Sequence, residues 1–255
     1  MVKIATPISH LFRNKEYAKL IMKHSDCLEC RDDSFGSRLL KQELFHCELQ
    51  PIHKLTESNF EYLKDIKNNK LGLKLLTFHM ASSCGKPYIK NGVFKEGGRQ
   101  YSEEEALKNA GINFRRIRSI FNQGVRFAVE NTNYYPTGAY KYITDATFIS
   151  RVVKENKIDF VFDIAHARIT VQNKGINFEK YKNSLPLDNA IQIHLSSFKA
   201  RPDKLAFDAH DYPKPEEFAE AKRLISDGNL NYLTVEYYKN LRCLIRSLKL
   251  LRGLI

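Results

Sequence analysis

Short apolar runs alternate with helical patterns along this chain of 255 residues. Eight of the runs are rich in β-branched and aromatic residues, and each ends at or near a His, Asp or Glu. We expect strands at residues 4–10, 44–50, 74–80, 125–131, 159–166, 190–197, 205–211 and 232–238. The runs are apolar on both faces before their terminal polar residue, which is typical of buried parallel strands.

Amphipathic patterns with a period near 3.6 lie between the runs. They predict helices at residues 17–24, 58–69, 102–123, 144–156, 215–228 and 239–255. Ser102 and Glu105 have the spacing of a capping box, and Pro215 stands at a helix start. Strands that alternate with helices predict an α/β fold, here a (β/α)8 TIM barrel, and the length fits one domain over residues 1–255.

A TIM barrel gathers the C-terminal ends of its strands on one face, where its active site lies. The polar strand ends therefore predict a metal site made of His79, Glu130, Asp163, His166, His194, Asp208, His210 and Glu236. Imidazole and carboxylate ligands together suit Zn, Mn, Fe or Co. Eight such groups exceed the needs of one ion, so we expect two or three divalent metal ions. Glu130 and Glu236 are the predicted catalytic residues, which would bridge metals or move a proton.

Four further residues lie beside these strand ends: His10, His46, Glu48 and Asn131. Each would be an extra ligand or would orient one by a hydrogen bond. Cys27 and Cys30 form one C-x-x-C with no second pair at suitable spacing, so we expect packing residues there and not a zinc site. Residues 84–101, rich in Gly and Lys, predict an irregular loop on the active-site face.

Charge and composition limit which substrates, partners and cellular locations are expected. The net charge of +12 favours a phosphate-bearing substrate, with nucleic acid among the candidates, although it would also serve solubility alone. An odd number of cysteines fits a reducing compartment, the first residues read as a strand, and no apolar run approaches 18 residues. We therefore expect a cytoplasmic protein that does not enter a membrane. The motifs of nucleotide-binding folds, serine hydrolases and H-E-x-x-H metalloproteases are absent from the sequence.

The chain resembles the xylose isomerase-like TIM-barrel superfamily, which includes endonuclease IV, sugar isomerases and epimerases, and multinuclear non-heme iron oxidases. The similar segments are LTFHMASS, VENTNYY, FDIAHA, IHLSS, DAHD and TVEYY. By this resemblance, the eight candidate ligands match eight of the nine zinc ligands of endonuclease IV, which favours zinc over manganese and iron. The ninth, a histidine, has no counterpart, because residues 80–129 contain none, unless His10 or His46 takes its place.

The resemblance leaves four functions open. The first is metal-dependent phosphoester hydrolysis, as in endonuclease IV. The second is sugar isomerisation or epimerisation at one ion, for which Glu130, Asp163, His194 and Glu236 would suffice. The third is iron-dependent oxidation, for instance of a cysteine-containing peptide. The fourth, a barrel that only binds a partner, is disfavoured because buried carboxylates without a metal would repel one another.

Overall fold

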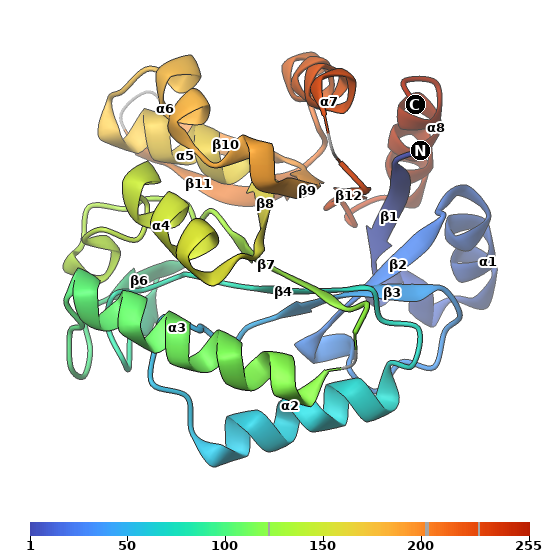
Figure 1. Cartoon of the computed structure of the whole chain (residues 1–255). Coiled ribbons are helices and arrows are strands. Elements are labelled where there is room, and N and C mark those ends of the chain that lie inside the picture. The colour runs from blue at the N-terminus through green and yellow to red at the C-terminus, as the bar shows by residue number, and fades with distance from the viewer. Residues whose placement is uncertain (122, 202–203, 229) are drawn as a thin grey trace.

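Eight parallel strands close into a barrel in this computed structural model, which describes residues 1–121, 123–201, 204–228 and 230–255 (Figure 1). Around the barrel the strands follow the order β1-β12-β9-β8-β7-β4-β3-β2. Their bounds are β1 (Lys3–Pro7), β2 (Cys27–Arg31), β3 (Gln42–Cys47), β4 (Leu75–Phe78), β7 (Arg126–Glu130), β8 (Asp159–Asp163), β9 (Ala190–Leu195) and β12 (Tyr232–Val235). The predicted α/β class and TIM-barrel architecture are confirmed, and we propose that residues 1–255 form this one domain.

Helices lie around the outside of the strands (Figure 1). They are α1 (Lys15–His24), α2 (Glu57–Asn69), α3 (Glu103–Ile120), α4 (Ala146–Asn156), α5 (Ile164–Lys174), α6 (Phe178–Ser184), α7 (Pro215–Asp227) and α8 (Leu241–Arg252). The predicted capping box is confirmed, since the Ser102 hydroxyl accepts the backbone N–H of Glu105. Helix α5 was not expected. The chain leaves the sheet at Asp163, whose carboxylate accepts the N–H of His166 and caps this helix.

The inside of the barrel is layered, because side chains two residues apart on a strand point the same way. One buried apolar residue from each strand fills the layer near the N-terminal ends: Ala5, Cys27, Leu44, Leu75, Ala128, Val161, Ile191 and Tyr232. Two positions further along, six strands carry a buried polar residue instead: Glu29, His46, Thr77, Glu130, Asp163 and Thr234. The strand period therefore places a polar layer directly above an apolar plug, toward the C-terminal ends.

The prediction of a barrel strand at residues 205–211 is wrong. This segment belongs to β11 (Lys204–Asp211), which pairs antiparallel with β10 (Ser197–Arg201) in a separate two-stranded sheet. Alternation of polar and apolar residues is the same in parallel and antiparallel strands. A parallel crossover takes a dozen or more residues, and too few separate the end of β9 from the start of β11.

The barrel strand that the sequence did not reveal is β2. Its residues, CLECR, include no β-branched or aromatic side chain, so their composition does not favour a strand. Leu28 packs in the main core outside the barrel, while Cys27 belongs to the apolar plug inside it. Cys27 and Cys30 are buried free thiols, in agreement with the packing role expected for them.

Part of the loop expected at residues 84–101 is regular. Strands β5 (Tyr88–Lys90) and β6 (Val93–Lys95) form an antiparallel hairpin. Asn91 and Gly92 turn it with φ values of 54° and 74°, the left-handed conformation that an Asn-Gly hairpin turn requires. The Asn-Gly dipeptide is the sequence signal from which this hairpin could have been predicted. Across the described ranges, every helix is too short or too polar to cross a membrane.

Replacing Leu28 tests the assignment of β2. Leu28 is fully buried, so Leu28→Ala should lower the free energy of unfolding by about 2–5 kcal/mol through the cavity it leaves. Leu40→Ala is the matched control, because Leu40 is 80% exposed and its loss should change stability by less than about 0.5 kcal/mol. Urea unfolding measures both, and equal effects would contradict the placement of β2 in the barrel.

Candidate metal centre

Side chains from β3 and β7 and from the end of β4 converge at one side of the polar layer. His46 Nε2 lies 2.8 Å from His79 Nε2, and the two rings approach Glu130 Oε2 at 3.5 and 3.4 Å. Thr77 orients His46: its hydroxyl donates to the carbonyl of Phe45, so its oxygen accepts from His46 Nδ1 at 2.6 Å. Nε2 of a neutral His46 ring then presents a lone pair to the cluster.

Glu130 also belongs to a second group, with Asp163 and His166. His166 Nδ1 lies 3.9 Å from Glu130 Oε2 and 3.8 Å from Asp163 Oδ2. Nδ1 also lies 2.9 Å from the carbonyl of Asn131, and this contact orients the ring. Oδ2 of Asp163 is buried without a hydrogen-bond partner among the described residues. An acceptor orphaned in this way is costly unless a cation satisfies it.

A third group contains Glu29, His194 and Glu236. His194 Nε2 lies 3.2 Å from Glu29 Oε2, and its Nδ1 lies 2.6 Å from Glu130 Oε1 and 3.4 Å from Glu236 Oε1. Arg31 forms ion pairs with Glu29, at 2.9 Å, and with Glu236. Sequence reasoning missed Glu29 and Arg31, since both lie on the unrecognised strand β2.

The β10–β11 hairpin brings two further predicted residues to the cluster. Asp208 Oδ2 lies 3.6 Å from His166 Nε2 and 3.2 Å from His210 Nε2, which is itself 3.3 Å from Glu236 Oε2. His210 has a φ of 40°, in the left-handed region that non-glycine residues rarely adopt. Such backbone strain is often found at functional sites, and here it directs the ring between two carboxylates.

These buried groups shift one another's pKa values. Burial alone would raise the pKa of Glu130, but the imidazoles of His194 and His46 hold it well below its usual range. Burial alone would lower the pKa of His194, but Glu29 and Glu130 raise it to about 9. Burial raises the pKa of Asp163 to about 6. Shifts of this kind are typical of functional sites, and a divalent cation would displace the imidazole protons.

The donors fit a divalent transition metal. Each of three sets offers ligand atoms within 4.8 Å of one another: His46, His79 and Glu130; Glu130, Asp163 and His166; Glu29, His194 and Glu236. Mixed imidazole and carboxylate ligands suit Zn, Mn, Fe or Co. The cluster reaches solvent through the side chains of His79 and His210, which are 29% and 28% exposed. A substrate could therefore approach buried ligands from one side.

The structure brings all eight predicted ligands into this cluster. Among the additional candidates, His46 lies beside His79, where it can take the place of the ninth histidine that the motif comparison found missing. His10, in the 3-10 helix η1 (His10–Arg13), and Glu48, just after β3, lie at the surface outside the cluster. The N–H of Glu48 donates to Asp32.

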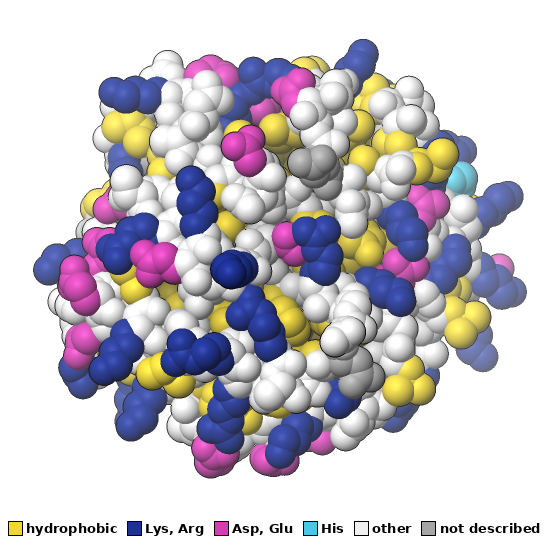
Figure 2. Space-filling view, in the orientation of Figure 1, with side chains coloured by type: hydrophobic (Ala, Val, Ile, Leu, Met, Phe, Trp, Pro, Cys, Tyr) yellow, Lys and Arg dark blue, Asp and Glu magenta, His cyan; other side chains and the backbone are white. Residues whose placement is uncertain are grey.

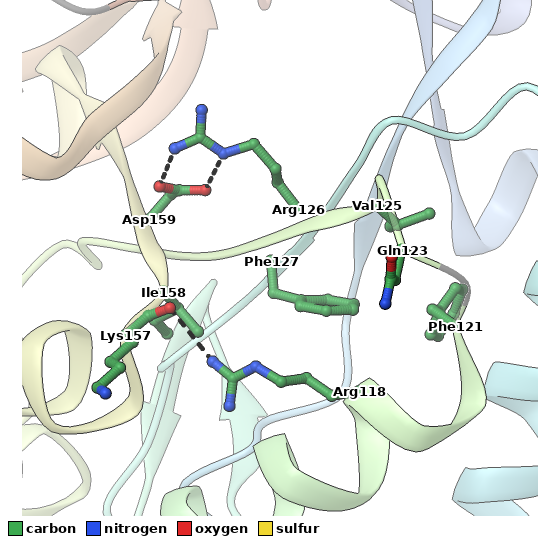
Figure 3. Close-up of a pocket in the computed structure, with 9 residues that line it drawn as sticks. All are labelled: Arg118, Phe121, Gln123, Val125, Arg126, Phe127, Lys157, Ile158 and Asp159. Atoms are coloured by element: carbon green, nitrogen blue, oxygen red, sulfur yellow. Dashed lines mark hydrogen bonds and ion pairs between the residues drawn. The ribbon is translucent and has the colours of Figure 1, made fainter.

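A pocket of about 400 Å³ lies at the opposite end of the barrel, where β7 and β8 begin (Figure 3). Its cationic side chains are Arg118, Arg126 and Lys157, and both arginines have partners. Arg126 donates to Asp159 at 2.7 Å, and Arg118 donates to the carbonyl of Lys157 at 3.2 Å. The pocket is therefore remote from the cluster, and its two arginines are already paired.

Known structures share this fold over its whole length. The xylose isomerase domain protein from Planctomyces limnophilus aligns with a TM-score of 0.62 and 10% identity, over 99% of this chain and 96% of that chain. The D-allulose 3-epimerase from Methylomonas sp. aligns with a TM-score of 0.61 and 12% identity, over 100% and 98%. The chain thus has the TIM-barrel fold of these proteins, which is consistent with the superfamily expected from its motifs.

Sequence comparison gives a more specific similarity than the comparison of folds. Residues 101–226 match the model of a family described as the RiPP precursor modification enzyme MbnB/TglH/ChrH, where RiPP denotes a ribosomally synthesised, post-translationally modified peptide. A UPF0276 protein of Acaryochloris marina is 22% identical over 155 residues, which cover 61% of this chain and 54% of that protein. The chain thus matches about half the length of this relative.

Asn131 tests how the centre is positioned. Its side chain accepts the N–H of Asp163 at 2.9 Å and donates to the carbonyl of Asp163 at 3.0 Å, so it ties the ends of β7 and β8 together. Asn131→Ala would leave two buried backbone groups unpaired and should cost about 1–3 kcal/mol for each of them. Asn68→Ala, on the exposed side of α2, should change stability by less than about 0.5 kcal/mol. Chemical denaturation measures the stability of both variants. Equal stabilities would contradict this role of Asn131.

Proposed function

We propose that this protein is a metal-dependent enzyme whose centre holds two divalent ions. One ion would be held by His46, His79 and Glu130, and the other by Glu130, Asp163 and His166. The observation that carries the proposal is the buried carboxylate of Glu130, which is common to two compact sets of buried and half-buried donors. A carboxylate that is common to two donor sets can bridge two ions, as two-metal sites require. The proposal of an enzyme also agrees with the description of the matched family, which is that of a modification enzyme.

Iron is the favoured ion, in place of the zinc favoured by sequence alone. The support is the resemblance of the sequence motifs to the multinuclear non-heme iron oxidases of this superfamily, together with the match to a family of precursor modification enzymes. Bound iron would supply redox chemistry with dioxygen. Of the chain's own residues, Thr77 and Asn131 orient the imidazoles of His46 and His166, and the apolar plug below them excludes water from that side.

We further propose that the substrate is a precursor peptide. The support is the match over residues 101–226, which includes Glu130, Asp163, His166, Asp208 and His210. The net charge of +12 favours an anionic partner, and Figure 2 shows Lys and Arg spread over the visible face with fewer Asp and Glu among them. A cytoplasmic location stays a prediction, supported by five free cysteines.

Sugar epimerisation at one ion is the second candidate. It is favoured by the epimerase among the structural neighbours and by the contacts of His194 with both Glu130 and Glu236. It is disfavoured by Arg31, whose ion pair with Glu236 occupies one of the four donors needed. Phosphoester hydrolysis stays a prediction that rests on the net charge and on the ligand motifs.

Metal content tests the two-ion centre. Protein purified anaerobically without chelators should carry two iron ions per chain by elemental analysis. Glu130→Gln should lose both, because its carboxylate is common to both groups, whereas His46→Ala should lose one. His24→Ala is the matched control, since His24 lies at the end of α1, outside the cluster, and should keep both ions. Full retention of metal by Glu130→Gln would contradict the shared-ligand arrangement.

Reactivity distinguishes the candidate functions. Iron-loaded protein should change the mass of members of a library of cysteine-containing peptides only when dioxygen is present, and serine analogues of the same peptides should stay unchanged. Glu130→Gln should lower this turnover by at least about 100-fold, because loss of a residue that only orients a ligand already costs about 10–100-fold. Interconversion of D-allulose and D-fructose by the manganese or cobalt form would favour the epimerase instead. Cleavage of abasic DNA by the zinc form would favour the hydrolase.

A further inference from the structure

Arg31 is the one arginine placed within the ligand cluster of the described structure. It ends strand β2, and its guanidinium lies between Glu29 and Glu236. Its side chain is 22% exposed, whereas those of Glu29 and Glu236 are 1% and 4% exposed. A buried carboxylate pair would repel strongly without a cation between its members. Arg31 supplies that cation from the chain itself.

Glu29 has no free acceptor position toward the cluster. Its Oε1 accepts from Arg31 Nε and Nη2 at 3.2 and 2.9 Å. Its Oε2 accepts from Gln192 Nε2 at 2.7 Å and from the Thr234 hydroxyl at 3.2 Å, and it lies 3.2 Å from His194 Nε2. A carboxylate whose two oxygens already accept hydrogen bonds has its charge compensated and is poorly suited to bind a metal.

Glu236 is occupied in a similar way, with Arg31 at Oε1 and His210 Nε2 3.3 Å from Oε2. The two kinds of partner differ in one decisive respect. A histidine gives up its proton when a metal ion binds, so a carboxylate that faces an imidazole remains open to metal. A guanidinium does not lose its proton in proteins, so Arg31 holds Glu29 and Glu236 at any working pH.

The two donor sets that contain Glu130 have carboxylates that remain open to a metal ion. Asp163 keeps a buried oxygen without a hydrogen-bond partner among the described residues, and Glu130 faces imidazoles that can lose their protons. From this contrast we propose that Arg31 takes the place of a third metal ion at Glu29, His194 and Glu236. It limits the centre to the two ions of the proposed function, on which this inference rests.

Zinc titration of the apoprotein tests the inference without any catalytic readout. Competition with a chromophoric chelator should give two zinc ions per chain for the wild-type protein and three for Arg31→Met, which frees both carboxylates. Arg31→Lys keeps the charge and should stay at two. Arg38→Met is the matched control, because Arg38 is exposed in the segment after β2, and it should also stay at two.

Thermal unfolding supplies an independent readout. Apo Arg31→Met should unfold at a lower temperature than the wild-type apoprotein, and zinc should raise its Tm by more than it raises that of the wild type. If Arg31→Met does not fold, the double variant Glu29→Gln with Arg31→Met removes both charges and should bind two ions. Two ions in both wild type and Arg31→Met, or three in the wild type, would overturn the role of Arg31. Uptake of no zinc by the wild type would overturn the proposed function instead, and this inference with it.

Discussion

Buried negative charge around Glu130 is the constraint on which the centre depends. Glu130 and Asp163 are 2% and 1% exposed, and taking such ions out of water costs several kcal/mol each unless they are paired. Imidazoles from β3, β9 and α5 surround them, and in the proposed function two metal ions complete the compensation. Because each carboxylate is balanced by several groups at once, the effects of single replacements in this cluster will not be additive.

The barrel meets this constraint through the period of its strands. Each strand gives one residue to the apolar plug, and in six strands the residue two positions later is polar and buried. The plug closes the barrel below the ligands, while the β10–β11 hairpin adds Asp208 and His210 beside the opening. The third set of donors is built from the same layer but is neutralised within the chain, by Arg31 in our proposal. The fold thus offers more donors than the metal centre uses.

Much of this arrangement could be predicted from the sequence, and the failures have physical causes. Polar residues that end apolar runs revealed the barrel and eight of the residues that the structure gathers, because the end of a strand fixes where its next side chain lies. Strand β2 escaped because an inward-facing Glu29 breaks the apolar pattern by which strands are recognised. Segment 205–211 was misplaced because alternation does not reveal strand direction. Only the tertiary structure shows that His46 belongs to the cluster and that Glu48 and His10 do not. Burial depends on neighbouring elements and not on local sequence.

Anomalous X-ray diffraction from crystals of the iron-loaded protein tests the two-ion centre most directly. The account predicts two iron peaks that share Glu130 as a ligand, one bound by His46 and His79 and the other by Asp163 and His166. Metal–ligand distances should be about 2.0–2.2 Å, as is usual for nitrogen and oxygen donors. Arg31 should still pair with Glu29 and Glu236. A single peak between Glu29, His194 and Glu236, with Arg31 displaced, would contradict the account.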